Sequence, residues 1–173
     1  MRIFAITTLL FITFFCKSLN GQFLINVNSV LIFPVGENNG RLIDFGPGVD
    51  LTIGYSFSNY FDIGLSFEQI WLVSVVSGYR VSSFRFNAKY FLLHDNIRPF
   101  AGVTAGWYRD GFDEPFQLNS RINSNGLGGG PNFGVQFFLY KNLWVNTNVY
   151  YSVIYTDPRT NALGAQLGLL KYF

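Results

Sequence analysis

The chain has 173 residues, of which 49% are hydrophobic and only 13% charged, and its formal net charge is +2. This length suits one domain, yet beyond the first residues no apolar run reaches the roughly 18 to 20 residues that a transmembrane helix needs. High apolar content without long apolar runs is typical of strands in which apolar and polar residues alternate.

The first 21 residues have the pattern of a secretory signal peptide. A positive start at Arg2 is followed by an apolar stretch over 3–16 and a small, polar run over 17–21 that suits cleavage. A single anchoring helix is the alternative, and the apolar stretch is short for it. Without the signal, ten basic and ten acidic residues remain and no cysteine, so the mature domain at 22–173 offers neither a basic surface for nucleic acid nor thiolate metal sites.

The first two predicted strands show the alternation most clearly. Between 23 and 33 the odd positions are apolar apart from Ser29, and Asn26 and Asn28 lie on the other face. Between 43 and 57 every odd position is apolar or aromatic and every even one is small or polar. Because strand side chains alternate faces, each strand has one apolar and one polar face. The apolar face carries the large residues and the polar face the glycines and carboxylates, which favours a membrane barrel with a polar interior.

Three further strands are predicted at 61–73, 83–92 and 98–108. With the strand at 43–57, they place most of the charged residues of the strands on inward faces. These residues are Asp44, Asp50, Asp62, Glu68, Arg85, Lys89 and Arg98.

The longest segment without alternation follows, at 109–125, and it is predicted to be an exposed loop. Its charged residues include Asp110, Asp113, Glu114 and Arg121. The acidic members could bind a divalent cation, but a solvated acidic loop is the simpler interpretation. Three more strands, at 127–139, 145–155 and 163–173, complete the chain.

The connections between these eight strands alternate in length. Those after the second, fourth and sixth strands are tight and polar, and the others are longer. Outer-membrane barrels have an even number of strands, short periplasmic turns and longer external loops. The sequence therefore predicts a transmembrane antiparallel up-and-down β-barrel of eight strands with a polar, side-chain-filled lumen and both termini in the periplasm.

Glycines and aromatic residues agree with this orientation. Eleven of the 18 glycines fall on predicted inner faces, since the interior of an eight-stranded barrel has little room for side chains. Aromatic residues gather near strand ends, as in the two interfacial girdles of membrane barrels. The predicted girdles are Tyr55, Phe57, Phe61, Tyr90 and Phe173 at the turn end and Trp71, Trp107, Tyr151 and Tyr155 at the loop end.

The chain resembles the small eight-stranded outer-membrane barrels of Gram-negative bacteria, the OmpA-transmembrane and OmpX-like group and the related outer membrane protein beta-barrel domain or PorT-like families. The resemblance is carried by the signal, the strand at 98–108 and the closing segment 167–173. In that group a terminal aromatic residue with apolar residues at alternate upstream positions is read by the barrel-assembly machinery, which implies this role for Phe173, Leu169 and Leu167. Lys171 departs from the usual apolar residue, although a lysine at an interface can snorkel.

The inward charges are predicted to meet near the middle of the barrel. If each hairpin folds about its connection, Asp50 lies beside Glu68 and Glu68 lies opposite Arg85, with Lys89 a neighbour on the turn side. Buried charges must be paired and hydrogen-bonded. We therefore expect the network to fill and close the lumen, with a proton or ion path as the alternative.

No catalytic, cofactor or metal site is predicted. Barrel enzymes that act on lipid or protein use a histidine to activate a hydroxyl or water, and His94 lies in a predicted turn at the opposite end from their active sites. The sequence thus favours a non-enzymatic protein that acts through its exposed loops or as a small subunit of an envelope assembly, with outer-membrane lipid as a partner. A narrow channel or transport accessory is the first alternative, and a lipid-modifying enzyme the second.

Overall fold

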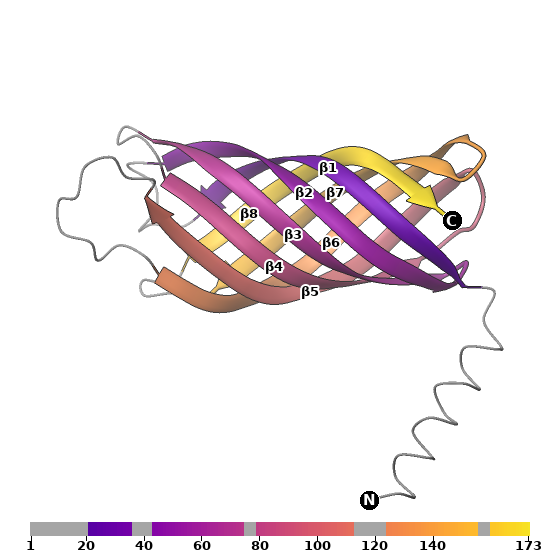
Figure 1. Ribbon diagram of the computed structural model, residues 1–173, viewed down its shortest axis with the longest axis horizontal. Coiled ribbons are helices and arrows are strands. Elements are labelled where there is room, and N and C mark those ends of the chain that lie inside the picture. The colour runs from indigo at the N-terminus through magenta and orange to yellow at the C-terminus, as the bar shows by residue number, and fades with distance from the viewer. Residues whose placement is uncertain (1–20, 36–42, 75–78, 113–123, 156–159) are drawn as a thin grey trace, which may run out of the picture.

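The computed structural model describes residues 21–35, 43–74, 79–112, 124–155 and 160–173. They form eight antiparallel strands that pair in chain order, and the last pairs with the first to close a barrel (Figure 1). The strands are β1 (Gln22–Val35), β2 (Ile43–Ser58), β3 (Phe61–Ser74), β4 (Tyr79–Phe91), β5 (Ile97–Phe112), β6 (Ser124–Tyr140), β7 (Leu143–Ile154) and β8 (Thr160–Tyr172). Within the described residues no helix is long and apolar enough to cross a membrane. The predicted fold class is confirmed, while the first 20 residues of the predicted signal lie outside the described part.

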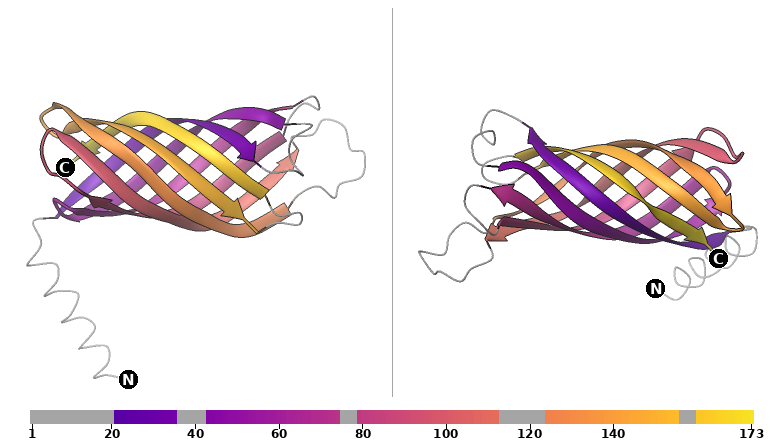
Figure 2. Two further views of the ribbon diagram at one scale, coloured as in Figure 1. Left: turned by 180° about the vertical axis from the view of Figure 1, so that it is seen from behind. Right: turned by 90° about the horizontal axis from the view of Figure 1, so that it is seen from above.

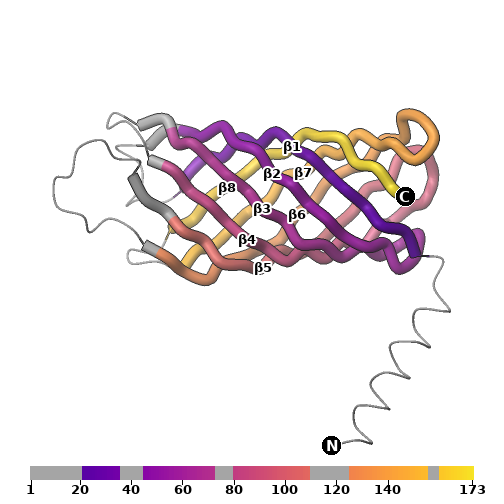
Figure 3. Tube along the Cα trace, in the orientation of Figure 1, coloured from indigo at the N-terminus to yellow at the C-terminus, as the bar shows by residue number. Residues whose placement is uncertain are grey.

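The barrel closes along a seam between β1 and β8, which runs from Leu24 opposite Tyr172 to Val35 opposite Asn161. Figure 2 shows a continuous wall from behind and from above, and Figure 3 shows the strands tilted against the barrel axis. The start of β1 and the end of β8 lie at the same end, together with the tight β2–β3, β4–β5 and β6–β7 connections. We call it the turn end, and the opposite end the loop end.

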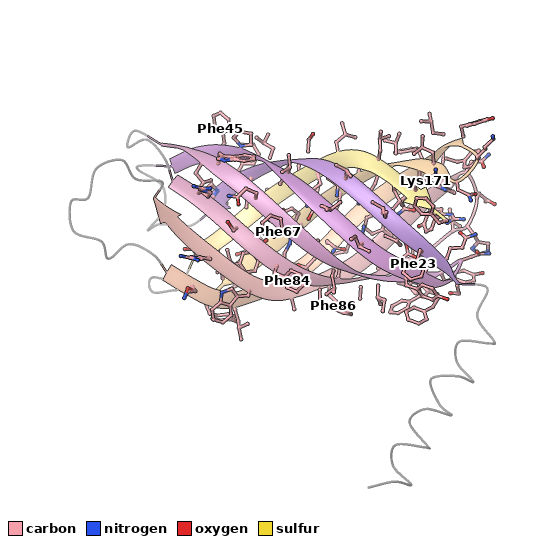
Figure 4. The ribbon with its side chains drawn as sticks, viewed as in Figure 1. Phe23, Phe45, Phe67, Phe84, Phe86 and Lys171 are labelled. Atoms are coloured by element: carbon pink, nitrogen blue, oxygen red, sulfur yellow. The ribbon has the colours of Figure 1, made fainter. Side chains whose placement is uncertain are left out.

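Burial follows a period of two along the strands, with the polar side chains inside. On β1, Val27 is 55% exposed while Asn26 and Asn28 on either side are each 2% exposed. Figure 4 shows Phe67 and Phe84 on the outer wall, where both are about half exposed. A wall that exposes its large apolar side chains and buries its amides suits surrounding lipid.

Glycines give the inward side chains their room. A Cβ built on Gly164 of β8 would overlap the ring of Tyr150 from β7, and one on Gly106 of β5 would press on Arg85. The predicted use of small residues inside the barrel therefore has a direct steric cause.

Pro47 interrupts the ladder between β2 and β3. It pairs with Leu31 of β1, but the β2–β3 register has no pair at Gly46 or Pro47 and shifts between Ile43 and Phe45. Proline has no N–H to donate to a ladder. The ladder therefore has a gap at Pro47, and the pairs on either side of it, Phe45 with Val73 and Gly48 with Ile70, keep one register.

Several predicted strands are too short at the loop end: β5 extends to Phe112 and not to 108, and β4, β6 and β8 begin at Tyr79, Ser124 and Thr160 and not at 83, 127 and 163. The β5–β6 ladder extends to the pair of Asp110 with Ser124, and Asp110 also pairs with Val81 of β4. Asp110 therefore belongs to a strand and not to the loop. Backbone pairing continues at the rim beyond the point where apolar and polar residues stop alternating. At the rim both faces of a strand can carry polar residues, so the alternation no longer shows where the strand ends.

Candidate functional site

A buried cluster of three charged side chains lies in the middle of the barrel. The Nη2 atom of Arg85 is 2.9 Å from Oδ2 of Asp50 and 2.8 Å from Oε2 of Glu68. All three side chains are at most 2% exposed. The structure thus brings together the three residues that the sequence places in one network. One cation faces two carboxylates, so further hydrogen bonds must stabilise the excess negative charge.

Neutral donors from other strands surround Glu68. Its Oε2 atom accepts hydrogen bonds from the Tyr150 hydroxyl of β7 at 2.9 Å and the Gln166 amide of β8 at 3.2 Å, and its Oε1 atom accepts one from Ser83 at 3.3 Å. The ring of Tyr150 also lies 5.1 Å from the guanidinium carbon of Arg85. Glu68 therefore connects strands on opposite sides of the lumen.

Asp50 has its own set of partners. Its Oδ1 atom accepts hydrogen bonds from the Asn28 amide at 2.8 Å and the Thr52 hydroxyl at 3.1 Å. The Asn28 side chain in turn accepts one from Asn146 of β7 at 3.4 Å. The cluster is thus tied into the wall on both sides of the β1–β8 seam.

The predicted pairing within the cluster is half right. Asp50 lies opposite Glu68 in the β2–β3 ladder, as expected from the turn at Asn59. Glu68, however, pairs with Ser83, whereas Arg85 pairs with Ser66. The β3–β4 ladder begins at Leu72 and Tyr79, so the connection is centred one position earlier than predicted and the register differs by two residues.

A second polar group lies inside the turn end. The Tyr172 hydroxyl donates to Oδ2 of Asp62 at 2.8 Å and lies 3.1 Å from the side-chain amide of Gln136. The guanidinium carbon of Arg98 is 4.1 Å from the ring centroid of Trp144 and 6.0 Å from that of Tyr172. These contacts hold the end of β8 to β3 and β6 across the lumen.

Apolar clusters, which the sequence analysis did not predict, occupy the interior at both ends of the barrel. Leu24, Trp144, Leu170 and Tyr172 pack together at the turn end. Ile32, Ile70, Leu72 and Ala162 pack at the loop end, with Val81 against them. Strand parity could have located them, because each of these residues, Val81 included, has the same parity as the inward polar residues of its strand.

Two cavities lie in the interior, each with a volume of about 10 Å³, about the size of one water molecule, and the second of them adjoins the charged cluster at Asp50 and Arg85. The first is lined by residues that include Asp62, Lys89 and Gln136, and the second by residues that include Arg85 and Tyr150. Lys89 borders both, with its ammonium 4.7 Å from the ring of Phe100. Polar atoms without a protein partner also line them, among them Oδ1 of Asp62 and Nε of Arg85. One ordered water in each cavity suits these atoms.

The structure describes the predicted girdle residues but not all of the remaining predicted charged residues. The side chains of Asp44 and Asp110 and the whole of Asp113, Glu114 and Arg121 lie outside the described part. The girdle residues all lie on the outer wall, half-buried or exposed: Tyr55, Phe57, Phe61, Tyr90 and Phe173 towards the turn end and Trp71, Trp107, Tyr151 and Tyr155 towards the loop end. Leu167 and Leu169 are exposed on the same wall.

His94 lies at the turn end, where its Nε2 atom is 2.8 Å from the hydroxyl of Tyr60. The two rings pack edge to face with centroids 4.3 Å apart. Among the described residues no group of three histidine, cysteine or acidic side chains could hold a metal ion.

A closed barrel of eight antiparallel strands, apolar outside and polar inside, defines the fold of the small bacterial outer-membrane barrels. Solved structures of such proteins are similar to this chain over most of its length. Neisserial surface protein A has a TM-score of 0.73 at 15% identity, covering 87% of this chain and 97% of its own. OprG from Pseudomonas aeruginosa has a TM-score of 0.61 at 14% identity, covering 90% and 97%. Ail, the attachment invasion locus protein of Yersinia pestis, has a TM-score of 0.58 at 20% identity, covering 88% and 97%.

No protein-family model matches the sequence, and no curated protein matches it either. The resemblance to known barrels therefore rests on the fold.

Proposed function

We propose that the chain is an integral protein of the bacterial outer membrane, non-enzymatic and closed, with both termini in the periplasm. It acts at its loop end, through the connections at 36–42, 75–78, 113–123 and 156–159, or as a small subunit of a larger envelope assembly. Insertion by the barrel-assembly machinery, with Phe173, Leu169 and Leu167 as its signal, is part of the same proposal.

The observation that carries the proposal is the filled interior. Arg85 is held between Asp50 and Glu68, and an apolar cluster lies on each side of them along the barrel. Buried charge that is paired in this way stabilises a fixed arrangement and offers no free cation or anion to a passing solute. With the interior filled, the rim and the outer wall are the surfaces left for contact with other molecules.

The similar structures support a role at the loop end. The name of one describes a surface protein, and that of another refers to attachment and invasion. Loops held by a rigid scaffold commonly carry binding functions. A narrow channel is the alternative, and the two water-sized interior cavities, both bordered by Lys89, favour it.

A measurement of conductance distinguishes the proposed closed barrel from the alternative, a narrow channel. Purified protein inserted in a planar lipid bilayer is expected to give no steady current, because the interior is filled at its centre and at both ends. Far-ultraviolet circular dichroism and the shift in gel mobility on heating would show that the inserted material is a folded barrel. Steady unitary conductance from folded protein would overturn the closed-barrel proposal.

Photo-crosslinking in intact cells tests where the protein acts. A benzophenone amino acid is placed at Gln117 in the β5–β6 connection, at Val103 on the outer wall or at Asn142 in a turn. Val103 is 59% exposed on β5. Protein adducts from Gln117 support action through the loops, and adducts from Val103 support packing as a subunit. Protein adducts from Asn142 alone, or from none of the three, would contradict the proposal.

A further inference from the structure

The turn-end rim of β6 to β8 carries two neighbouring lysines on the outside of the barrel. Lys171 lies on the outer wall of β8 (Figure 4), opposite Leu143 of β7. Lys141 is in the tight turn before β7, where it has a positive φ of 50°. The Tyr172 amide donates to the Asn142 carbonyl at 3.0 Å, so this turn is joined to the end of β8. The turn that carries Lys141 and the strand end that carries Lys171 are therefore neighbours along the rim.

Aromatic contacts show where the two charges lie. The Nζ atom of Lys171 is 4.9 Å from the ring centroid of Phe173, which is two residues nearer the end of the barrel. The Nζ atom of Lys141 is 5.1 Å from the ring centroid of Tyr140. Both rings are exposed on the outside, Phe173 at 59% and Tyr140 at 64%. The methylene stem of Lys171 thus lies along the apolar wall and its ammonium extends towards the rim.

These charges lack acidic partners. Within the described residues neither lysine forms an ion pair, in contrast to Arg85 inside the barrel. Asp95 is on the same rim, in the β4–β5 connection, and also forms no ion pair within those residues. The rim beside β8 therefore presents two cations above exposed aromatic rings, at the depth where lipid headgroups begin.

We propose that Lys141 and Lys171 bind the phosphate of an anionic phospholipid in the leaflet that surrounds the turn end. The rings of Tyr140 and Phe173 pack beside the glycerol region, and the two ammonium groups reach the phosphate oxygens. A lipid with net negative charge is preferred to a zwitterionic one, whose own cation offsets this attraction. The inference rests on the proposed insertion in a membrane and adds a lipid preference to it.

Native mass spectrometry of the full chain, refolded in detergent and titrated with lipid, tests the proposal. Wild-type protein is expected to retain palmitoyl-oleoyl phosphatidylglycerol in preference to palmitoyl-oleoyl phosphatidylcholine. Each lysine near a headgroup contributes about a fivefold change in affinity. We therefore expect Lys141→Gln with Lys171→Gln to lose most of the retained phosphatidylglycerol, and the two lysine-to-arginine substitutions to keep it.

Arg109→Gln is the matched control, because Arg109 is an exposed cation near the loop end of β5. It should leave phosphatidylglycerol retention unchanged. Equal retention of both lipids by the wild type, or equal retention of phosphatidylglycerol by the wild type and the glutamine double variant, would overturn the inference.

The same samples separate this inference from the proposed function. Reconstitution into vesicles, followed by trypsin and a heat-dependent gel shift, shows whether the chain inserts as a barrel. Failure of the wild type to insert would contradict the proposed function itself. Insertion without a preference for phosphatidylglycerol would contradict only the lipid site.

Discussion

Arg85 and Glu68 lie in direct contact, 2.8 Å apart, although neither faces the other in the ladder. Their contact is diagonal, displaced by two residues, and long side chains can make such contacts on one face of a sheet. The same guanidinium nitrogen reaches Asp50 on β2. One side chain of β4 therefore holds β2 and β3, and Tyr150 and Gln166 extend the connection to β7 and β8 through Glu68.

Removal of Glu68 should strongly destabilise the barrel. In Glu68→Ala, Arg85 keeps Asp50, but Tyr150 and Gln166 lose their acceptor and the interior gains a cavity. Breaking a buried charged contact costs about 3 to 5 kcal/mol. We expect a loss of this size in the free energy of unfolding, measured by reversible urea unfolding in phospholipid vesicles.

The control for this variant is Asp113→Ala, which changes an acidic residue in the β5–β6 connection. Surface substitutions usually change stability by less than about 0.5 kcal/mol. Equal unfolding midpoints for the two variants would show that the buried cluster does not stabilise the fold.

The alternation of apolar and polar side chains predicted the architecture. Once one residue of a strand is known to face outward, the period of two tells which face every other residue of that strand lies on. It also predicted that Asp50 lies beside Glu68, since the tight turn at Asn59 fixes that register. The register of β3 and β4 depends on a connection with no comparable turn signal, and there the prediction was wrong by two residues. Contacts across the lumen, such as Tyr150 with Glu68, depend on barrel diameter and shear, which no local pattern contains.

Tyr172 illustrates the same limit and gives a second prediction. Its parity points inward, but nothing in the sequence shows that its hydroxyl reaches Asp62 on the far side of the lumen, at 2.8 Å. In Tyr172→Phe the ring still packs against Trp144, while the carboxylate loses a donor. The expected cost is about 1 to 3 kcal/mol. Urea unfolding checks it against Tyr151→Phe, a change on the exposed outer wall that should be nearly neutral.

The close packing of Gly164 against Tyr150 inside the barrel gives a third prediction. A methyl group at Gly164 would collide with the ring of Tyr150, so Gly164→Ala should cost about 1 to 3 kcal/mol, as overpacking does in other cores. The neighbouring Ala165 points outward and is exposed, and Ala165→Leu should be tolerated in lipid. A folded fraction after refolding into vesicles that is lower for Ala165→Leu than for Gly164→Ala would reverse the assignment of inner and outer faces.

The apolar wall gives a final prediction that depends on depth in the membrane. Leu167 is 58% exposed near the middle of β8, whereas Tyr155 is 66% exposed beside the loop end of β7. An arginine on the lipid face of a barrel costs about 2 to 4 kcal/mol at the midplane and about 0 to 1 kcal/mol near an interface. Leu167→Arg should therefore lower the free energy of unfolding in vesicles well below that of Tyr155→Arg. In detergent micelles, where the apolar layer adapts more readily, the difference should shrink. Equal costs in vesicles would mean that the exposed wall does not face the hydrocarbon layer, because only a medium whose polarity changes with depth can distinguish the two positions.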